Sequence, residues 1–144
     1  MKKLFFTSLI LFAAATAGLS QSSNDEAAIT KIVHKFAMYA DQQDTDKMDK
    51  ILDDHFRSVV NQLFGSKEVS TMDKSTYLQM LSDKKIGGDK RQVSVLKVDQ
   101  TANNAMVLAR FSGKELHFTT YILLVKDVNG QWKIVNDMPH IEKA

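Results

Sequence analysis

Residues 116–138, LHFTTYILLVKDVNGQWKIVNDM, predict a β-hairpin with apolar side chains on both faces. Residues 116–125 are rich in aromatic and β-branched side chains, which is typical of a strand. The pair Asn129-Gly130 tolerates positive φ angles and predicts a two-residue type I′ turn. In the returning strand, we expect one face to carry Trp132, Ile134, Asn136 and Met138. A strand that is apolar on both faces is normally covered on both, here by the chain's own helices and by a second subunit.

Residues 1–20 predict a cleavable secretory signal peptide. Lys2 and Lys3 precede a short apolar run, and small residues such as Ala17 and Ser20 follow it. The run is shorter than the roughly 20 apolar residues that span a membrane comfortably. We expect cleavage after Ser20, with the bond after Ala17 as the alternative, and a secreted or periplasmic protein. The chain has no cysteine, so it offers no site for lipidation.

The remaining residues, 21–144, predict a single domain with no net charge. Removing two lysines from a total of 19 basic residues leaves 17, against 17 acidic residues. A neutral chain of mixed charges gives no electrostatic reason to expect binding to nucleic acid, or to membrane once the signal is removed. Without disulfide bonds, the core alone has to hold the fold together.

The order of elements predicts an α+β fold. A capping box from Ser23 to Glu26 predicts a helix over residues 24–41, and Asp44 or Thr45 predicts the cap of a short second helix. Asp73 predicts the start of a third helix. Strands are expected over residues 56–64, 67–72, 91–98, 105–111, 116–125 and 131–138. Together these elements predict a cystatin-like cone, in which a strongly curved antiparallel sheet wraps around the long N-terminal helix, with two shorter helices.

No metal, cofactor or catalytic motif is predicted. The expected end of the second helix carries Asp49, Asp53, Asp54 and His55, but these residues do not converge on one helical face. The sequence contains no nucleophile elbow, phosphate loop or HExxH spacing.

Residues 121–136, YILLVKDVNGQWKIVN, together with the order of elements, resemble the nuclear transport factor 2-like (NTF2-like) superfamily. Within it, the chain is most similar to small secreted bacterial proteins labelled "putative lumazine-binding", which are relatives of SnoaL-like and ketosteroid-isomerase-like proteins. The resemblance covers residues 21–144. Such folds host isomerases, cyclases, dehydratases and non-catalytic binders, so the resemblance implies a fold and only weakly a ligand.

The resemblance does not carry the chemistry of ketosteroid isomerases to this chain. Those enzymes use an Asp general base on the first strand, with a Tyr and a protonated Asp as donors to the substrate oxygen. The matching positions here are Val60, Phe36 and Ile122, none of which can transfer a proton. Isomerase or dehydratase activity is therefore the least favoured of three hypotheses.

The other two hypotheses are a non-catalytic binder of a small apolar or aromatic molecule, and a structural or protein-interaction domain whose cone is filled by side chains. The first predicts a mainly apolar, acid-free pocket. Its candidate lining residues are Phe36, Ser58, Val60, Gln62, Tyr77, Phe118, Thr120, Ile122, Trp132 and Asn136. The opposite face of the hairpin is too apolar to leave wet and predicts a homodimer. It carries His117, Thr119, Tyr121, Leu123 and Val125.

Overall fold

The computed structural model describes the backbone of residues 15–144 and the side chains from residue 24 onward. The helices of this part are α1 (Ala15–Gln42), α2 (Thr45–Ile51) and α3 (Lys74–Ser82), with a 3-10 turn, η1 (Leu63–Gly65). The strands are β1 (Leu52–Asn61), β2 (Val69–Asp73), β3 (Gln92–Thr101), β4 (Asn104–Ser112), β5 (Leu116–Lys126) and β6 (Trp132–Lys143). The predicted α+β class is confirmed.

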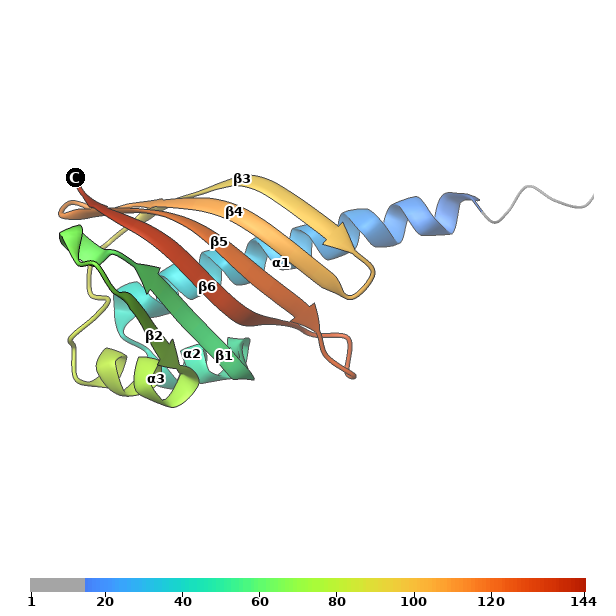
Figure 1. Ribbon diagram of the computed structural model, residues 1–144. Coiled ribbons are helices and arrows are strands. Elements are labelled where there is room, and N and C mark those ends of the chain that lie inside the picture. Colours follow the sequence, from blue (N-terminus) through green and yellow to red (C-terminus); the bar gives the residue numbers. More distant parts are fainter. Residues whose placement is uncertain (1–14) are drawn as a thin grey trace, which may run out of the picture.

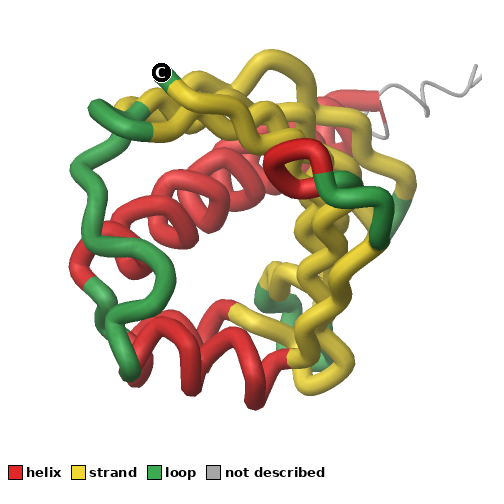
Figure 2. Tube along the Cα trace, turned by 60° about the vertical axis from the view of Figure 1, so that its left-hand side comes forward, coloured by secondary structure: helices red, strands yellow, loops and turns green. Residues whose placement is uncertain are grey.

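The strands form one curved sheet in the order β2-β1-β6-β5-β4-β3. Figure 1 shows α1 running behind the sheet, with α2 and α3 along its lower edge. Seen along the sheet in Figure 2, strands and helices surround a common interior, as the predicted cone requires. The sheet is mixed rather than wholly antiparallel, because β1 pairs in parallel with β6. That pair joins the first strand to the last, and no local sequence signal marks such a long-range pairing.

Helix α1 packs a single apolar face against the sheet. Its buried residues include Ile29, Val33, Phe36, Ala37 and Ala40, which recur at helical spacing. The helix already begins at Ala15, so Ser23 does not start it and the predicted boundary is wrong for the chain described here. Among the described residues, no helix is long and apolar enough to cross a membrane.

The two shorter helices begin where their caps predict. The Asp44 carboxylate accepts a hydrogen bond from the Lys47 backbone N–H at 3.0 Å, and Asp73 accepts one from Thr76 at 2.8 Å. Both carboxylates satisfy amides that a helix leaves unpaired at its first turn. The end of α2 was predicted too late, because the segment from Asp53 to His55 already belongs to β1.

The β5–β6 connection is longer than the predicted two-residue turn. Residues 127–131 form the loop, and of the pair Asn129-Gly130 only Gly130 has a positive φ, at 76°. The Asp127 carboxylate accepts hydrogen bonds from the backbone N–H groups of Asn129 and Gln131, at 2.9 and 2.8 Å. This side chain supplies the turn with acceptors, so a type I′ geometry is not required.

A β-bulge changes which face of β6 points into the cone. Leu123 pairs with Asn136 and Leu124 pairs with Ile134, so one residue of β6, Val135, is extra. Beyond an extra residue the two-residue alternation is inverted. Trp132 and Ile134 are therefore buried as predicted, whereas Asn136 and Met138 lie on the outer face. Asp137 and Pro139 point inward in their place. The strand also continues through Pro139 to Lys143 instead of ending before the proline.

Candidate functional site

Aromatic rings fill the centre of the cone. The Phe36 ring lies 6.0 Å from the Tyr77 ring and 6.4 Å from that of Phe111, measured between ring centroids. Phe56 meets Tyr77 edge to face at 5.3 Å. Such offset and edge-on contacts are the favourable arrangements of aromatic pairs. The interior near α1 and α3 is therefore a packed aromatic cluster.

Beside these rings lies a buried carboxyl group, that of Asp137 on β6. It is only 6% exposed, and its two oxygens face hydroxyl groups from neighbouring strands. Thr120 on β5 donates a hydrogen bond to Oδ1 at 2.6 Å, and Ser58 on β1 donates a longer one to Oδ2 at 3.4 Å. Both hydroxyl residues are themselves buried. The three side chains form a polar cluster in an otherwise apolar interior, called here the Asp137 cluster.

Burial dominates the electrostatics of this cluster. Loss of water around the carboxyl group raises the pKa of Asp137 to about 6, although the Thr120 and Ser58 hydroxyls and the nearby Arg91 charge oppose the rise. Burial also raises the pKa of the Tyr77 phenol, and the Asp137 charge adds to that effect. At neutral pH, Tyr77 is thus a neutral phenol, whereas Asp137 is close enough to its pKa for both of its forms to be populated.

The guanidinium group of Arg91 packs on two aromatic rings and on α1. It lies over the rings of Phe111 and Phe118, 5.4 and 5.1 Å from their centroids. Its Nε donates to the Asp41 carboxylate at 2.6 Å, and its Nη2 donates to the Ala37 carbonyl at 3.1 Å. The Arg91 side chain therefore fastens the segment before β3 to the C-terminal part of α1.

Several residues predicted to line a pocket do lie inside the cone. Buried there are Phe36, Ser58, Val60, Tyr77, Thr120 and Ile122, with half-buried Phe118 beside Arg91. The inward orientation predicted for Gln62 and Asn136 was wrong, whereas Trp132 is buried as predicted. Gln62 is exposed, in a left-handed conformation after β1 has ended. Asn136 faces outward and donates to the Arg57 carbonyl at 3.1 Å. Trp132 is buried, but five residues away from Asp137, at the start of β6.

Asp137 itself was missed, and the prediction of an acid-free interior was wrong. Strict alternation from Trp132 placed Asp137 on the outer face, and the bulge at Val135 reverses that placement. The residue type did not indicate a buried position either, because an aspartate near a strand end is usually exposed.

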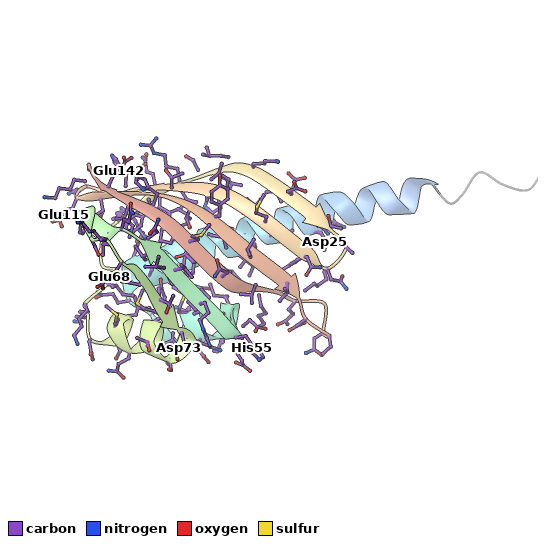
Figure 3. The ribbon with its side chains drawn as sticks, in the orientation of Figure 1. Asp25, His55, Glu68, Asp73, Glu115 and Glu142 are labelled. Atoms are coloured by element: carbon purple, nitrogen blue, oxygen red, sulfur yellow. The ribbon has the colours of Figure 1, made fainter. Side chains whose placement is uncertain are left out.

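Two of the acidic residues around the end of α2 form ion pairs with a lysine. Lys74 Nζ lies 2.9 Å from the Asp49 carboxylate and 3.0 Å from that of Asp54. His55 is exposed and contacts Asp53 at 3.2 Å. Figure 3 shows His55 and Asp73 at the α2–α3 edge of the sheet, while Glu68, Glu115 and Glu142 gather at the far end. Among the described residues, no three His, Asp or Glu side chains are grouped to hold a metal ion.

Comparison with solved structures defines the class of fold. An NTF2-like protein of unknown function from Silicibacter pomeroyi superposes with a TM-score of 0.73 at 17% identity, covering 84% of this chain and 98% of that one. A protein with a cystatin-like fold from Nostoc punctiforme gives 0.66 at 12% identity, with coverages of 82% and 91%. A ketosteroid isomerase-like protein from Erwinia carotovora atroseptica gives 0.63 at 13% identity, with coverages of 81% and 94%. The fold is therefore NTF2-like.

The sequence itself identifies the family within that class. Residues 24–140 match the family described as "Putative lumazine-binding", and the chain belongs to it. The recognition of an NTF2-like chain from residues 121–136 is confirmed. A search of curated proteins found no match for this sequence.

Proposed function

We propose that this protein binds a small, flat, largely apolar molecule in the cone, held by the Asp137 cluster. The observation that carries the proposal is a carboxyl group buried in the interior and hydrogen-bonded by two hydroxyls. Burying an ionisable group lowers the stability of the fold. Packing of the core alone therefore gives no reason for such a group here. Strongly shifted acids that lie among apolar walls are typical of binding and catalytic sites.

The chemistry of the cluster favours a ligand with N–H or O–H donors. When ionised, the Asp137 carboxylate has acceptor capacity beyond its bonds to Thr120 and Ser58. The family description names lumazine, a flat heterocycle that carries such donors. The rings of Phe36 and Phe111 offer the apolar surface on which such a molecule would stack, once the packed cluster rearranges around it.

Ligand entry would require movement of the wall, for instance of the segment that Arg91 fastens to α1. This segment also contacts α1 and Gln43 through Gly88 N–H to the Ala40 carbonyl at 3.1 Å and Gln43 Nε2 to the Ile86 carbonyl at 3.0 Å. Gly87 has a φ of 74°, and a side chain there would collide with the Ala40 carbonyl.

The test is a thermal-shift screen against lumazine, other aromatic heterocycles and steroid-like compounds, with native mass spectrometry of the purified protein to detect carried ligand. We expect at least one compound to raise the melting temperature and to bind about tenfold more weakly to Asp137→Asn. Glu115→Gln, which removes an exposed acid far from the cluster, is the matched control and should bind as the wild type does. Equal binding by wild type and Asp137→Asn, or no stabilisation by any compound, would contradict the proposal.

One observation favours a second candidate function, general acid–base chemistry. A carboxyl group with a pKa of about 6 can both accept and release a proton near neutral pH. Incubating the protein with a β,γ-unsaturated ketosteroid and following the conjugated product tests this role. Turnover by the wild type and its loss in Asp137→Asn would support it, whereas turnover that survives the substitution would exclude Asp137 as the acting group.

We also propose a homodimer formed through the outer face of the sheet. Tyr121, Leu123 and Met138 on that face are each at least 40% exposed. The buried Nδ1 of the neighbouring His117 lacks a hydrogen-bond partner within the described residues. Sedimentation at micromolar concentration should give a dimer, and Leu123→Glu should give a monomer. A wild-type monomer would contradict the proposal.

We also propose that the protein is exported from the cytoplasm. The charged and apolar pattern of residues 1–20 supports it, and that pattern lies outside the residues whose side chains are described. N-terminal sequencing of the protein recovered from outside the cytoplasm should begin at Gln21 or Gly18. A mature protein that retains Lys2 and Lys3 would contradict it.

A further inference from the structure

A second concave surface lies outside the cone, where α1, α2 and the β5–β6 loop meet. It encloses a cavity of about 420 Å³. Its floor is apolar and includes Ile32, Ile51, Tyr39 and Trp132. Five lysines surround this floor, namely Lys31, Lys35, Lys47, Lys50 and Lys133. We call this surface the lysine groove.

The fold places the five lysines on three separate elements. Lys31 and Lys35 lie one helical turn apart on α1, and Lys47 and Lys50 lie on α2, three residues apart. Lys133 comes from β6, and its Nζ donates to the Lys50 carbonyl at the end of α2. Segments distant in the sequence thus bring their ammonium groups to one cavity, which a merely solvated helix face would not do.

Few carboxylates neutralise these charges. Within the described residues, Lys47 is the only one of the five with an ion pair, to Asp44 at 2.6 Å. The nearby Asp25 is already taken, since it accepts from Lys126 at 2.6 and 2.8 Å and from the Trp132 indole N–H at 3.3 Å. Figure 3 places Asp25 at one end of the sheet and the acids Glu68, Glu115 and Glu142 at the other. The residues described as lining the groove include five lysines and no acid, so the lining is positive in a chain whose total charge is small.

We infer that the lysine groove binds a small-molecule anion carrying several phosphate or carboxylate charges. Lysine ammonium groups are flexible point charges, and they suit phosphate and clustered carboxylate oxygens. The cavity is concave and about 420 Å³, which favours a small molecule over a flat membrane surface. The aromatic rings next to the groove are already covered by cations, with Lys47 Nζ 5.8 Å from the Tyr39 centroid and Lys126 Nζ 5.4 Å from the Trp132 centroid. Charge, rather than ring stacking, should therefore dominate the affinity.

Inorganic tripolyphosphate is the probe that tests this inference on the intact protein. Trp132 is the sole tryptophan of the chain, so its indole N–H gives a single resonance at the edge of the groove. We expect tripolyphosphate to shift that resonance at low ionic strength, and the affinity to fall steeply as salt is added. Calorimetry under the same conditions gives the dissociation constant.

The decisive comparison uses two triple variants with the same change in net charge. Lys31→Gln/Lys35→Gln/Lys50→Gln removes three groove lysines, and Lys67→Gln/Lys84→Gln/Lys143→Gln removes three exposed lysines elsewhere. We expect the first to weaken tripolyphosphate binding about tenfold or more and the second to weaken it about twofold or less. Circular dichroism of both variants shows whether they are folded.

Three outcomes would overturn the inference. The first is the absence of binding by the folded wild type at low salt. The second is an equal loss of binding in both triple variants, which would indicate a diffuse effect of net charge. The third is lysine-dependent binding to phosphatidylglycerol vesicles without binding of tripolyphosphate, which would assign the groove to a membrane surface. Because Asp137→Asn leaves the groove untouched, this experiment is independent of the one on the Asp137 cluster.

Discussion

Two aspartates that pair with adjacent residues of β1 have opposite properties. Asp73 pairs with Arg57 across the β1–β2 register, and Asp137 pairs with Ser58 across the β1–β6 register. Asp73 caps α3 in contact with water, and hydrogen bonds from Thr76 lower its pKa to about 2. Asp137 points into the cone, and burial raises its pKa to about 6. The face of the sheet, and not the residue type, decides whether folding raises or lowers the pKa of the carboxyl group.

The comparison explains why the interior cluster has the features of a site and the helix cap does not. The Asp73 carboxylate accepts hydrogen bonds from Ser75 and Thr76 in the first turn of α3 and stabilises that helix. The Asp137 carboxyl group accepts hydrogen bonds as well, but they do not compensate for the loss of water. The Asp137 carboxyl group is therefore a candidate reactive or ligand-binding group, held in a defined position by the Thr120 and Ser58 hydroxyls.

The largest effect is expected from opening the interior to water. Phe111→Ala removes a buried ring of the aromatic cluster and should destabilise the protein by about 3–5 kcal/mol. Urea unfolding measures the loss, and the pKa of Asp137 should fall toward its usual value if water reaches the cone. Phe64→Ala is the control, because the Phe64 ring is exposed and should change stability by only about 0.5 kcal/mol. Similar losses in both variants would show that the cone is not the packed core.

The next effect is the pH dependence of stability caused by Asp137. Its pKa is raised on folding, so its stabilising contribution is complete below pH 3.8 and is lost as the pH rises through about 6. Relative to Asp137→Asn, the wild type should lose about 3 kcal/mol between pH 3.8 and pH 8. Unfolding by urea across this pH range measures the difference.

Asp73→Asn provides the contrast for that prediction. The pKa of Asp73 is lowered on folding, so its contribution is present above pH 3.8 and is lost as the pH falls through about 2. Relative to Asp73→Asn, the stability of the wild type should therefore rise with pH between about 2 and 3.8, whereas relative to Asp137→Asn it should fall between 3.8 and about 6. Parallel pH profiles would remove the distinction between the two carboxyl groups.

A smaller effect is expected from the hydroxyl that contacts Asp137 most closely. Thr120→Val deletes the donor at 2.6 Å, keeps nearly the same shape and should cost about 1–3 kcal/mol. It should also raise the pKa of Asp137 further, because the ionised form loses a hydrogen bond. Thr119→Val, on the next residue and the other face of β5, is the control. An equal effect of the two substitutions would argue that Thr120 matters only as a strand residue.

The smallest effect is expected at the lysine groove. Lys31→Gln/Lys35→Gln should change the free energy of unfolding by no more than about 0.5 kcal/mol, because both side chains lie at the surface and have no ion pair within the described residues. At low salt, the change should be towards greater stability, since like charges are removed from one cavity. Urea unfolding at two salt concentrations checks this. A large destabilisation would mean that these lysines hold the fold together.

Local signals in the sequence predicted the parts of the fold that depend on local chemistry. Asp44 and Asp73 were recognised as helix caps because a cap needs only a carboxylate three residues before an amide. The periodic stripe of α1 and the run in residues 116–125 gave the long helix and the central strand. The NTF2-like fold followed from the order of these elements and from the closing motif.

The features that the sequence did not predict depend on contacts between distant segments. The parallel pairing of β1 with β6 and the extra residue at Val135 arise from the pairing of strands in the sheet. No residue composition in the sequence marks either feature. The bulge alone moved Asp137 from the predicted outer face into the cone, so the most informative residue of the candidate site was absent from the prediction. The lysine groove could not be predicted from the sequence either, because its lysines come from three elements.

The most direct test of this account is an NMR titration of the Asp137 carboxyl carbon in the folded wild-type protein, assigned by comparison with Asp137→Asn. A buried acid in the Asp137 cluster should titrate with a pKa of about 6. A pKa at or below the ordinary aspartate value of 3.8 would mean that water reaches the carboxyl group freely, and would contradict the account of the cone given above.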